Sequence, residues 1–185
     1  MRQRLTSLSL LTSMLLACSP GPGADPDPDT STIIDYDAEL PTDFPLSVGH
    51  YWPAGADFSA LEPGLDLEIV QGIQGGVHTE VALELDLGLG YADTVIVYFD
   101  LHIQTLLDGE EVVADLRLDG FKAGNMGFGV FLTQTLPIIF EQNEAVHYEG
   151  RDAVIVVMVT LDDQTSGQAA SVHLVDTRND LEGLE

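Results

Sequence analysis

Residues 77–87 read VHTEVALELDL, and this stretch decides the fold. Its odd positions carry Val, Thr, Val and three Leu residues, whereas its even positions carry His, Glu, Ala, Glu and Asp. Successive side chains of a β-strand point to opposite faces, so this alternation puts an apolar set on one face and a mostly acidic set on the other. We therefore predict a strand with one face in a core and one face in water.

The same pattern continues toward the C-terminus, over residues 95–104 and 112–119. Asp108-Gly109 lies between these two runs and predicts a tight hairpin turn, because both residues tolerate positive φ. Residues 154–161 are apolar on both faces, which is typical of a central strand covered on both sides or of one capped by a loop. Seven strands are predicted in all, at Leu67–Gln71, Val77–Leu87, Thr94–Leu106, Glu110–Leu118, part of Phe128–Phe140, Ala153–Leu161 and Gln168–Val175.

Several short strands separated by turn signals, with no helical period of useful length, predict an all-β domain. The expected architecture is an immunoglobulin-like β-sandwich of about seven strands. The cysteine pair of antibody domains is absent, so this prediction concerns architecture alone, and a small β-barrel is the alternative. We expect one domain over residues 32–185, which is long enough to bury a core of its own.

The charge balance limits the partners that the chain can have. It holds 31 Asp and Glu residues against 6 Lys and Arg residues, for a formal net charge of −25. Such a surface repels the phosphates of nucleic acid, so a nucleic-acid partner is excluded. It suits a cation or a basic protein partner, and it also serves solubility alone.

The N-terminus begins with Arg2 and Arg4, continues with the apolar run Leu5–Ala17, and reaches Cys18, the only cysteine. A run of about thirteen residues fits the apolar region of a signal peptide and is too short to cross a bilayer of roughly 30 Å as a helix. Residues 19–31 are rich in Pro, Gly and Asp, which predicts an extended tether. The expected organisation is a signal peptide over 1–17, then Cys18 and the tether over 18–31.

Leu15-Leu16-Ala17-Cys18 resembles the lipobox of bacterial lipoproteins. The resemblance implies cleavage before Cys18, lipidation of its thiol and acylation of its amine, and anchoring in a membrane of the cell envelope. Ser19 stands where Asp favours inner-membrane retention, so we expect the outer membrane. A plain secretory signal with an incidental cysteine is the alternative. With Cys18 lipidated, the chain has no internal disulfide.

Gln74-Gly75-Gly76-Val77-His78 is the most distinctive motif of the domain. Together with the lipobox and a later Gly150-Arg151-Asp152 before a strand, it resembles uncharacterised lipoproteins of myxobacterial type. That family implies no known activity and supplies no catalytic residue.

The five histidines raise the question of a metal site, and His78 and His102 are the candidate ligands for zinc or copper. If their two strands paired as a hairpin, both imidazoles would lie on one sheet face, but a connection that crosses between sheets would separate them. Such a site needs three or four converging ligands. Calcium is a further candidate, through Asp162-Asp163 or through Asp86 and Asp93.

No nucleophile elbow, phosphate-binding loop or dinucleotide motif is present in the sequence, so we expect no enzyme, no catalytic residue and no cofactor beyond a divalent metal. The expected function is that of a lipid-anchored envelope protein with a binding or structural role, and the alternative is a protein that handles Cu, Zn or Ca. Partners would dock on loops, since a sandwich presents these at its ends. The candidate loops lie near Gly72–Gly76, Tyr91–Asp93, Gly124–Gly127 and Gln164–Gly167.

Overall fold

The computed structural model describes residues 33–51, 57–71 and 76–176. The predicted signal peptide, Cys18 and the tether lie outside the described residues. Residues Thr32–Glu185 belong to one compact unit. No helix among the described residues is long and apolar enough to span a membrane.

The described chain is all-β, as predicted, with two short 3₁₀ helices between strands. Most strands form one ladder in the order β2-β1-β5-β8-β7-β6-β10-β11-β3. All neighbours in this ladder are antiparallel except β11 and β3, which are parallel. Two further strands, β4 and β9, also pair with β5. The elements are β1 (Leu46–His50), β2 (Ser59–Ala60), β3 (Leu65–Glu68), β4 (Val70–Gln71), β5 (Val77–Asp86), η1 (Leu89–Tyr91), β6 (Ile96–Leu107), β7 (Glu111–Gly127), β8 (Val130–Leu132), β9 (Leu136–Ile139), η2 (Ala145–His147), β10 (Asp152–Leu161) and β11 (Gln164–Val175).

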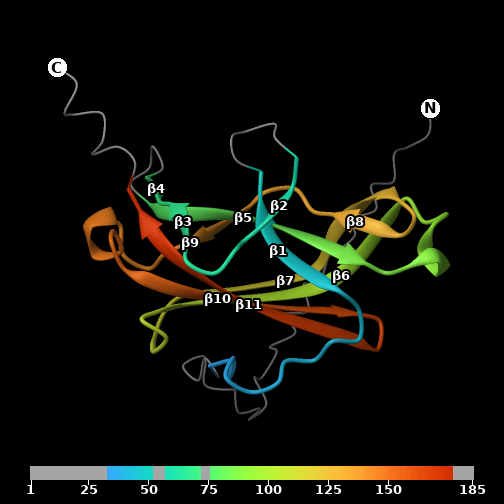
Figure 1. Ribbon diagram of the computed structural model, residues 1–185, viewed down its shortest axis with the longest axis horizontal. Coiled ribbons are helices and arrows are strands. Elements are labelled where there is room, and N and C mark those ends of the chain that lie inside the picture. Colours follow the sequence, from blue (N-terminus) through green and yellow to red (C-terminus); the bar gives the residue numbers. More distant parts are fainter. Residues whose placement is uncertain (1–32, 52–56, 72–75, 177–185) are drawn as a thin grey trace, which may run out of the picture. The chain divides into compact units, whose positions relative to one another are not determined.

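The strands lie in two layers, which makes the fold a β-sandwich (Figure 1). One layer holds β6, β7, β10 and β11, and the other holds β1, β3, β5, β8 and β9. The odd positions of β5 face the space between the layers, and Val77, Val81, Leu83 and Leu85 are fully buried there. Burial of one such side chain stabilises the fold by about 1.5–3 kcal/mol.

The ladder is open, because it begins at β2 and ends at β3 and no described strand joins these two. The small barrel that was the alternative is therefore not formed. The connection from β5 to β6 runs through η1 from one layer to the other, so the two strands with the clearest alternation are not neighbours.

The hairpin turn predicted at Asp108-Gly109 forms. Asp108 and Gly109 have positive φ values of 50° and 76° between β6 and β7. Asp162 has φ 54° in the two-residue turn that joins β10 to β11. The positive φ at these positions matches the right-handed twist of the flanking strands.

Strand β10 is central, as its two apolar faces predicted, since it pairs with β6 on one side and β11 on the other. Its odd residues face the core, yet Val156 on the other face is also fully buried. The segment before β1 contributes to this cover, because Leu40 and Met158 both press against Gly167 of β11.

The described strands number eleven rather than about seven. Two short strands, β1 and β2, form in the stretch that contains Pro41, Pro45, Pro53 and Pro63, where none of the seven strands was predicted. Two of the predicted strands are each interrupted. The largest difference is β7, which continues to Gly127 instead of ending near Leu118. The candidate loop near Gly124–Gly127 is therefore wrong, because residues 124–127 pair with β6 and β8 and only Phe128 and Gly129 form the turn.

Candidate functional site

The two candidate metal ligands lie on strands that do not pair. His78 is on β5, opposite Val70 of β4 and Ile139 of β9, whereas His102 is on β6, opposite Arg117 of β7 and Met158 of β10. Strands β8 and β7 come between β5 and β6 in the ladder. The hairpin that would bring the two imidazoles together is therefore not formed.

Each of these histidines has a carboxylate neighbour of its own. His102 Nε2 lies 2.8 Å from Asp115 Oδ1, and His78 Nε2 lies 4.0 Å from Glu80 Oε1. Within the ranges that the structure describes, no three His, Cys, Asp or Glu side chains are grouped so as to hold a metal ion. A metal site at His78 or His102 thus stays a prediction from sequence.

The neighbours of His102 indicate a structural role. Asp115 also accepts a hydrogen bond from Gln104 Nε2 (3.0 Å) and lies 3.5 Å from Arg117 Nε. Gln104 is fully buried, and its Oε1 accepts a hydrogen bond from Ile34 N (2.7 Å). This polar network therefore holds the segment before β1 against the outer face of β6 and β7.

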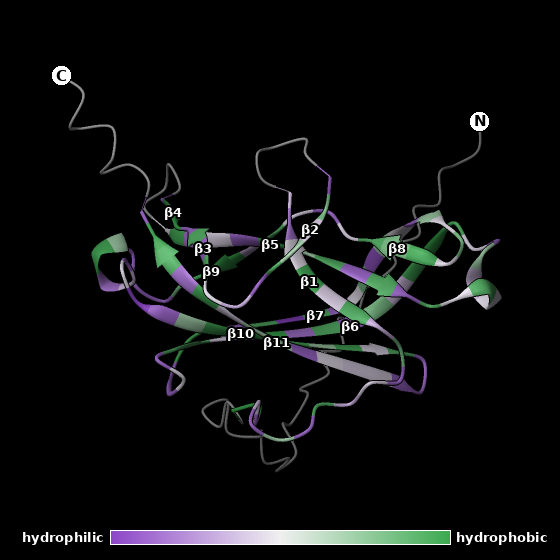
Figure 2. Cartoon of the chain, viewed as in Figure 1, coloured by the Kyte–Doolittle hydropathy of each residue, from purple (hydrophilic) through white to green (hydrophobic). Residues whose placement is uncertain are grey.

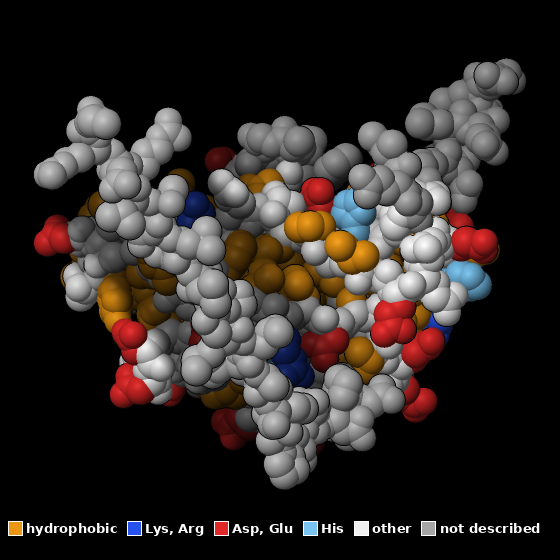
Figure 3. Space-filling model, turned by 180° about the vertical axis from the view of Figure 1, so that it is seen from behind, with side chains coloured by type: hydrophobic (Ala, Val, Ile, Leu, Met, Phe, Trp, Pro, Cys, Tyr) orange, Lys and Arg blue, Asp and Glu red, His pale blue; other side chains and the backbone are white. Residues whose placement is uncertain are grey.

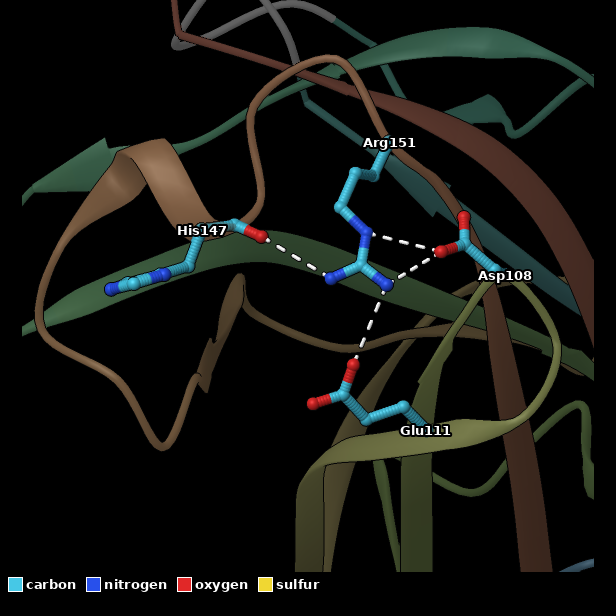
Figure 4. A network of polar contacts seen from close by, with 4 residues as sticks. All are labelled: Asp108, Glu111, His147 and Arg151. Atoms are coloured by element: carbon cyan, nitrogen blue, oxygen red, sulfur yellow. Dashed lines mark hydrogen bonds and ion pairs between the residues drawn. The ribbon is translucent and has the colours of Figure 1, made fainter.

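Arg151 joins two loops in a second polar network (Figure 4). Its Nε and Nη2 donate to Asp108 Oδ2 at 3.1 and 2.5 Å, its Nη2 also lies 3.4 Å from Glu111 Oε2, and its Nη1 donates to the His147 carbonyl (3.4 Å). The hydrogen bond with Asp108 raises the pKa of Arg151. Two carboxylates already neutralise this guanidinium, so the network ties the β6–β7 turn to the η2 loop rather than binding an anion.

A pocket of about 330 Å³ lies beside the ends of β1 and β3. Its lining includes His50, Tyr51 and four carboxylates. Burial, and secondarily the carboxylate of Glu84, raises the pKa of Tyr51. Such a lining disfavours anions and accepts a small cation; the carboxylates belong to Asp66, Glu68, Glu80 and Asp176.

The most distinctive surface lies at the opposite end of β5, where η1, the start of β6 and the β7–β8 turn meet (Figure 2). Six large apolar side chains are exposed there, by between 43% (Ile96) and 82% (Phe128). Soluble proteins seldom expose several large apolar side chains together unless the surface binds something. We name this surface the apolar end; it consists of Leu89, Val95, Ile96, Tyr98, Met126 and Phe128.

One side chain of β7 organises the loop of the apolar end. Asn125 Nδ2 lies within hydrogen-bond distance of the carbonyl oxygens of Thr94 (2.6 Å), Ala92 (3.1 Å) and Tyr91 (3.3 Å). Its Oδ1 accepts a hydrogen bond from Gly127 N (2.6 Å). The loop after η1 and the last residues of β7 are therefore fixed to each other, which lowers the entropy lost on binding.

The two turns of the apolar end touch through their backbones. Leu87 N donates to Gly129 O (2.9 Å), and a Cβ at Gly129 would lie 1.9 Å from Gly88 O. Gly129 also has φ +85°, and Phe128 before it has φ 57°. The close approach holds Phe128 and Leu89 at the surface instead of letting them fold back onto the core.

A groove of about 480 Å³ runs from the apolar end toward Tyr51 and Phe58. Ile96, Met126 and Lys122 are among the residues that line it. Among the described residues no carboxylate lies within 4 Å of the Lys122 ammonium, whereas Arg117 and Arg151 are both ion-paired. Viewed from behind, many hydrophobic side chains gather in the middle of the view, and most of the visible carboxylates lie farther out, with a few among them (Figure 3).

The sequence pointed to part of this surface and missed the rest. Of the four candidate docking loops, Tyr91–Asp93 lies here, and Asn125 joins it to Gly124–Gly127, which is the end of β7 and not a loop. Gln164–Gly167 is also wrong as a loop, because it begins β11, and residues 72–75 of the remaining candidate lie outside the described residues. The exposure of Leu89 and Phe128 was not predicted. A signal was present, because both stand between two glycines, in turns where polar residues are the rule.

No family model matches the chain, and no curated protein matches it. Among solved structures, it is similar to the CooA pilin subunit from enterotoxigenic Escherichia coli, with 11% identity and a TM-score of 0.30 over 71% of this chain and 97% of that chain. It is also similar to the N-terminal domain of PorA, with 11% identity and a TM-score of 0.26 over 70% of this chain and 97% of that chain. Likeness at this level carries no argument about what the chain does.

Proposed function

We propose that the chain is a lipid-anchored protein of the cell envelope, in the outer membrane, that binds another protein through its apolar end. The observation that carries the binding role is the gathering of six exposed apolar side chains on a surface held by Asn125. Covering apolar surface is favourable by about 25 cal/mol for each Å² removed from water. Because the loops are already fixed, little ordering would offset that gain.

The anchoring half of the proposal rests on the sequence. Cys18 follows a lipobox-like stretch, and residues 19–31 would hold the domain away from the membrane. Two or three acyl chains, at about 0.8 kcal/mol per buried methylene, anchor a protein durably. In a Cys18→Ser variant we expect the protein to leave the membrane fraction; a variant that still sediments with membranes would disprove lipid anchoring.

The binding half is tested by polar substitutions at the apolar end. Leu89→Ser and Phe128→Ser remove two exposed apolar side chains without touching the core, so folding stability should change by less than about 0.5 kcal/mol. We expect both variants to lose a protein cross-link that the wild-type chain forms in intact cells. Ile139→Ser and Val146→Ser are the matched controls, because these residues are similarly exposed (67% and 70%, against 75% for Leu89 and 82% for Phe128) and lie on other elements.

The second candidate function is the handling of a divalent cation, which the acidic pocket beside β1 and β3 favours. Metal analysis of the purified chain, repeated after Asp66→Asn and Glu80→Gln, tests it. Stoichiometric metal in the wild-type chain that both substitutions remove would support cation handling. Metal-free protein that gains no stability on addition of calcium, zinc or copper would eliminate it.

A further inference from the structure

At the start of β6, every second residue points its backbone N–H and C=O groups away from β7, its only described neighbour there. Asn125 N donates to Val95 O (2.9 Å), and the register from Ile96–Gly124 to Phe99–Phe121 is unbroken. In an antiparallel ladder the N–H and C=O groups of one residue point to the same neighbour and those of the next residue point to the other side. Because Val95 and Val97 face β7, the backbone groups of Ile96 and Tyr98 face away from it.

The side that these groups face has no described strand. Strand β10 pairs with β6 only from Leu107 to Asp100, where its last partner is Thr160, and it then turns toward β11. An unpaired edge of this kind is a template for another strand. Two other edges in the described part of the chain are blunted, because β2 has two residues and β9 carries Pro137, which has no N–H to donate. The far end of the ladder is β3, an edge strand of four residues.

The side chains beside this edge are apolar. Val95, Ile96 and Tyr98 are all exposed, and they continue into the rest of the apolar end. Strand addition uses main-chain hydrogen bonds for affinity and contacts with alternate side chains for specificity. The edge supplies the main-chain hydrogen bonds, and the groove along Ile96 and Met126 supplies the contacts for alternate side chains.

The charges around the edge are mostly negative. Asp93 and Asp100 flank it in sequence, and the register places the Asp162-Asp163 turn just beyond the end of β10. All four carboxylates belong to exposed residues. Two cations lie nearby: Lys122, opposite Tyr98, and Arg117, which lines a pocket with Asp100 and is ion-paired with Asp115. An occupant of this edge therefore gains from positive charge.

We propose that the edge at Ile96–Tyr98 binds an extended segment of a partner protein that adds as a strand and alternates apolar with basic residues. The proposal rests on the proposed function and names the kind of partner. A lipid bilayer fits less well, because it would leave the backbone groups of Ile96 and Tyr98 unsatisfied. A second copy of this chain fits less well, because pairing would bring two sets of the same carboxylates together.

The test uses the full-length chain in mild detergent and a labelled heptapeptide, Lys-Ile-Lys-Val-Lys-Ile-Lys, with blocked ends. In one derivative the backbone nitrogens of the three apolar residues are methylated. In the other derivative the backbone nitrogens of the three lysines that follow an apolar residue are methylated. In a strand these two sets of N–H groups point to opposite sides. We expect one derivative to bind like the parent and the other about tenfold or more weakly, as hot-spot contacts are lost; equal binding by both would overturn strand addition, because charge attraction alone does not distinguish them.

Variants of the protein test whether the peptide binds at this edge. Ile96→Pro removes an N–H that the ladder with β7 does not use, and Ile96→Ser with Tyr98→Ser removes the apolar contacts while keeping the backbone. Both variants should bind the parent peptide more weakly than the wild type does, whereas Ile139→Ser should bind it as the wild type does. Self-association that Ile96→Pro abolishes, or binding to phosphatidylcholine vesicles that Tyr98→Ser abolishes, would overturn the proposal in favour of a second copy or a membrane.

The two proposals can fail separately. If Leu89→Ser and Phe128→Ser lose the cellular cross-link while both methylated peptides bind alike, the apolar end binds a protein by another mode and only strand addition is wrong. If those two variants keep the cross-link, the proposed function is wrong whatever the peptides do.

Discussion

Asn125 Nδ2 lies 2.6 Å from the carbonyl oxygen of Thr94, and this hydrogen bond joins the end of β7 to the loop before β6. The two residues are 31 positions apart in the chain. The contact connects the two structural features on which the function depends, since Thr94 leads into the open edge of β6 and Asn125 precedes the turn that presents Phe128.

Loss of the Asn125 side chain should loosen the apolar end. Asn125→Ala leaves the Tyr91, Ala92 and Thr94 carbonyls without this donor, so we expect the free energy of unfolding to fall by about 1–3 kcal/mol. Denaturant titration measures the loss, and amide exchange should quicken around residues 91–94. Asn143→Ala is the control, because Asn143 is exposed and lies in the loop after β9; equal effects of the two substitutions would argue against this role.

A methyl group at Gly129 should disrupt the contact between the two turns. Gly129→Ala would place its Cβ 1.9 Å from Gly88 O at a φ of +85°, so steric overlap and backbone strain act together. We expect a loss of at least about 2 kcal/mol in the free energy of unfolding. In Gly90→Ala the Cβ meets nothing within 4 Å, and a similar loss there would show that the close approach is not the cause.

Tyr148 should contribute to alkaline unfolding. Burial raises the pKa of its phenol above the ordinary value of 10.0, although the hydrogen bond from Gln142 N partly opposes this. Above pH 10 the unfolded chain releases the phenol proton while the folded chain retains it, so the free energy of unfolding falls with rising pH. The contribution is complete below pH 10 and is lost as the pH passes the folded pKa.

Tyr148→Phe tests this directly. The variant loses the hydrogen bond from Gln142, about 1 kcal/mol at every pH, but its stability should decline less steeply than that of the wild type above pH 10. The exposed Tyr98→Phe serves as the control for removing a phenol. If the free energy of unfolding fell equally steeply with pH in the wild type and in Tyr148→Phe, Tyr148 would not contribute to alkaline unfolding.

The Arg151 network should be weak and sensitive to salt. Its partners Asp108 and Glu111 are well exposed, so water screens the attraction. For Arg151→Ala we expect a loss of no more than about 1 kcal/mol at low ionic strength, shrinking further at 1 M salt, where the Debye length is about 3 Å. A large loss that salt leaves unchanged would mean that the network is stabilised by burial instead.

Strands with one wet face could be predicted from sequence, and strands defined by tertiary contacts could not. Residues 77–87 predicted β5, because the alternation of apolar and polar residues indicates directly which face of a strand is buried. Strand β1 lies between Pro45 and Pro53, and its place in the fold depends on contacts such as the hydrogen bond from Val48 N to Gln168 Oε1 of β11 (2.6 Å), 120 residues away. The length of β7 was underestimated because the predicted strand ends at Leu118, just before Gly120. In the structure the register with β6 shifts at this point, and the pairing then resumes at Phe121.

The candidate site was predictable only in outline. Its loops could be found from their glycines, but which loops share an end depends on the crossing from β5 to β6, and no local pattern encodes that crossing. The same crossing separates His78 from His102. The open edge at Ile96 was invisible from sequence, because its existence depends on where β10 turns.

Site-specific photo-cross-linking in intact cells tests the central claim most directly. A benzophenone side chain would replace Phe128 at the apolar end and, in a separate strain, Val146, which is similarly exposed on η2. We predict that the Phe128 position forms a discrete adduct with another protein, that Leu89→Ser removes this adduct, and that the Val146 position forms none. The same adducts from both positions, or none from Phe128, would contradict the proposal that this end of the sandwich is the binding surface.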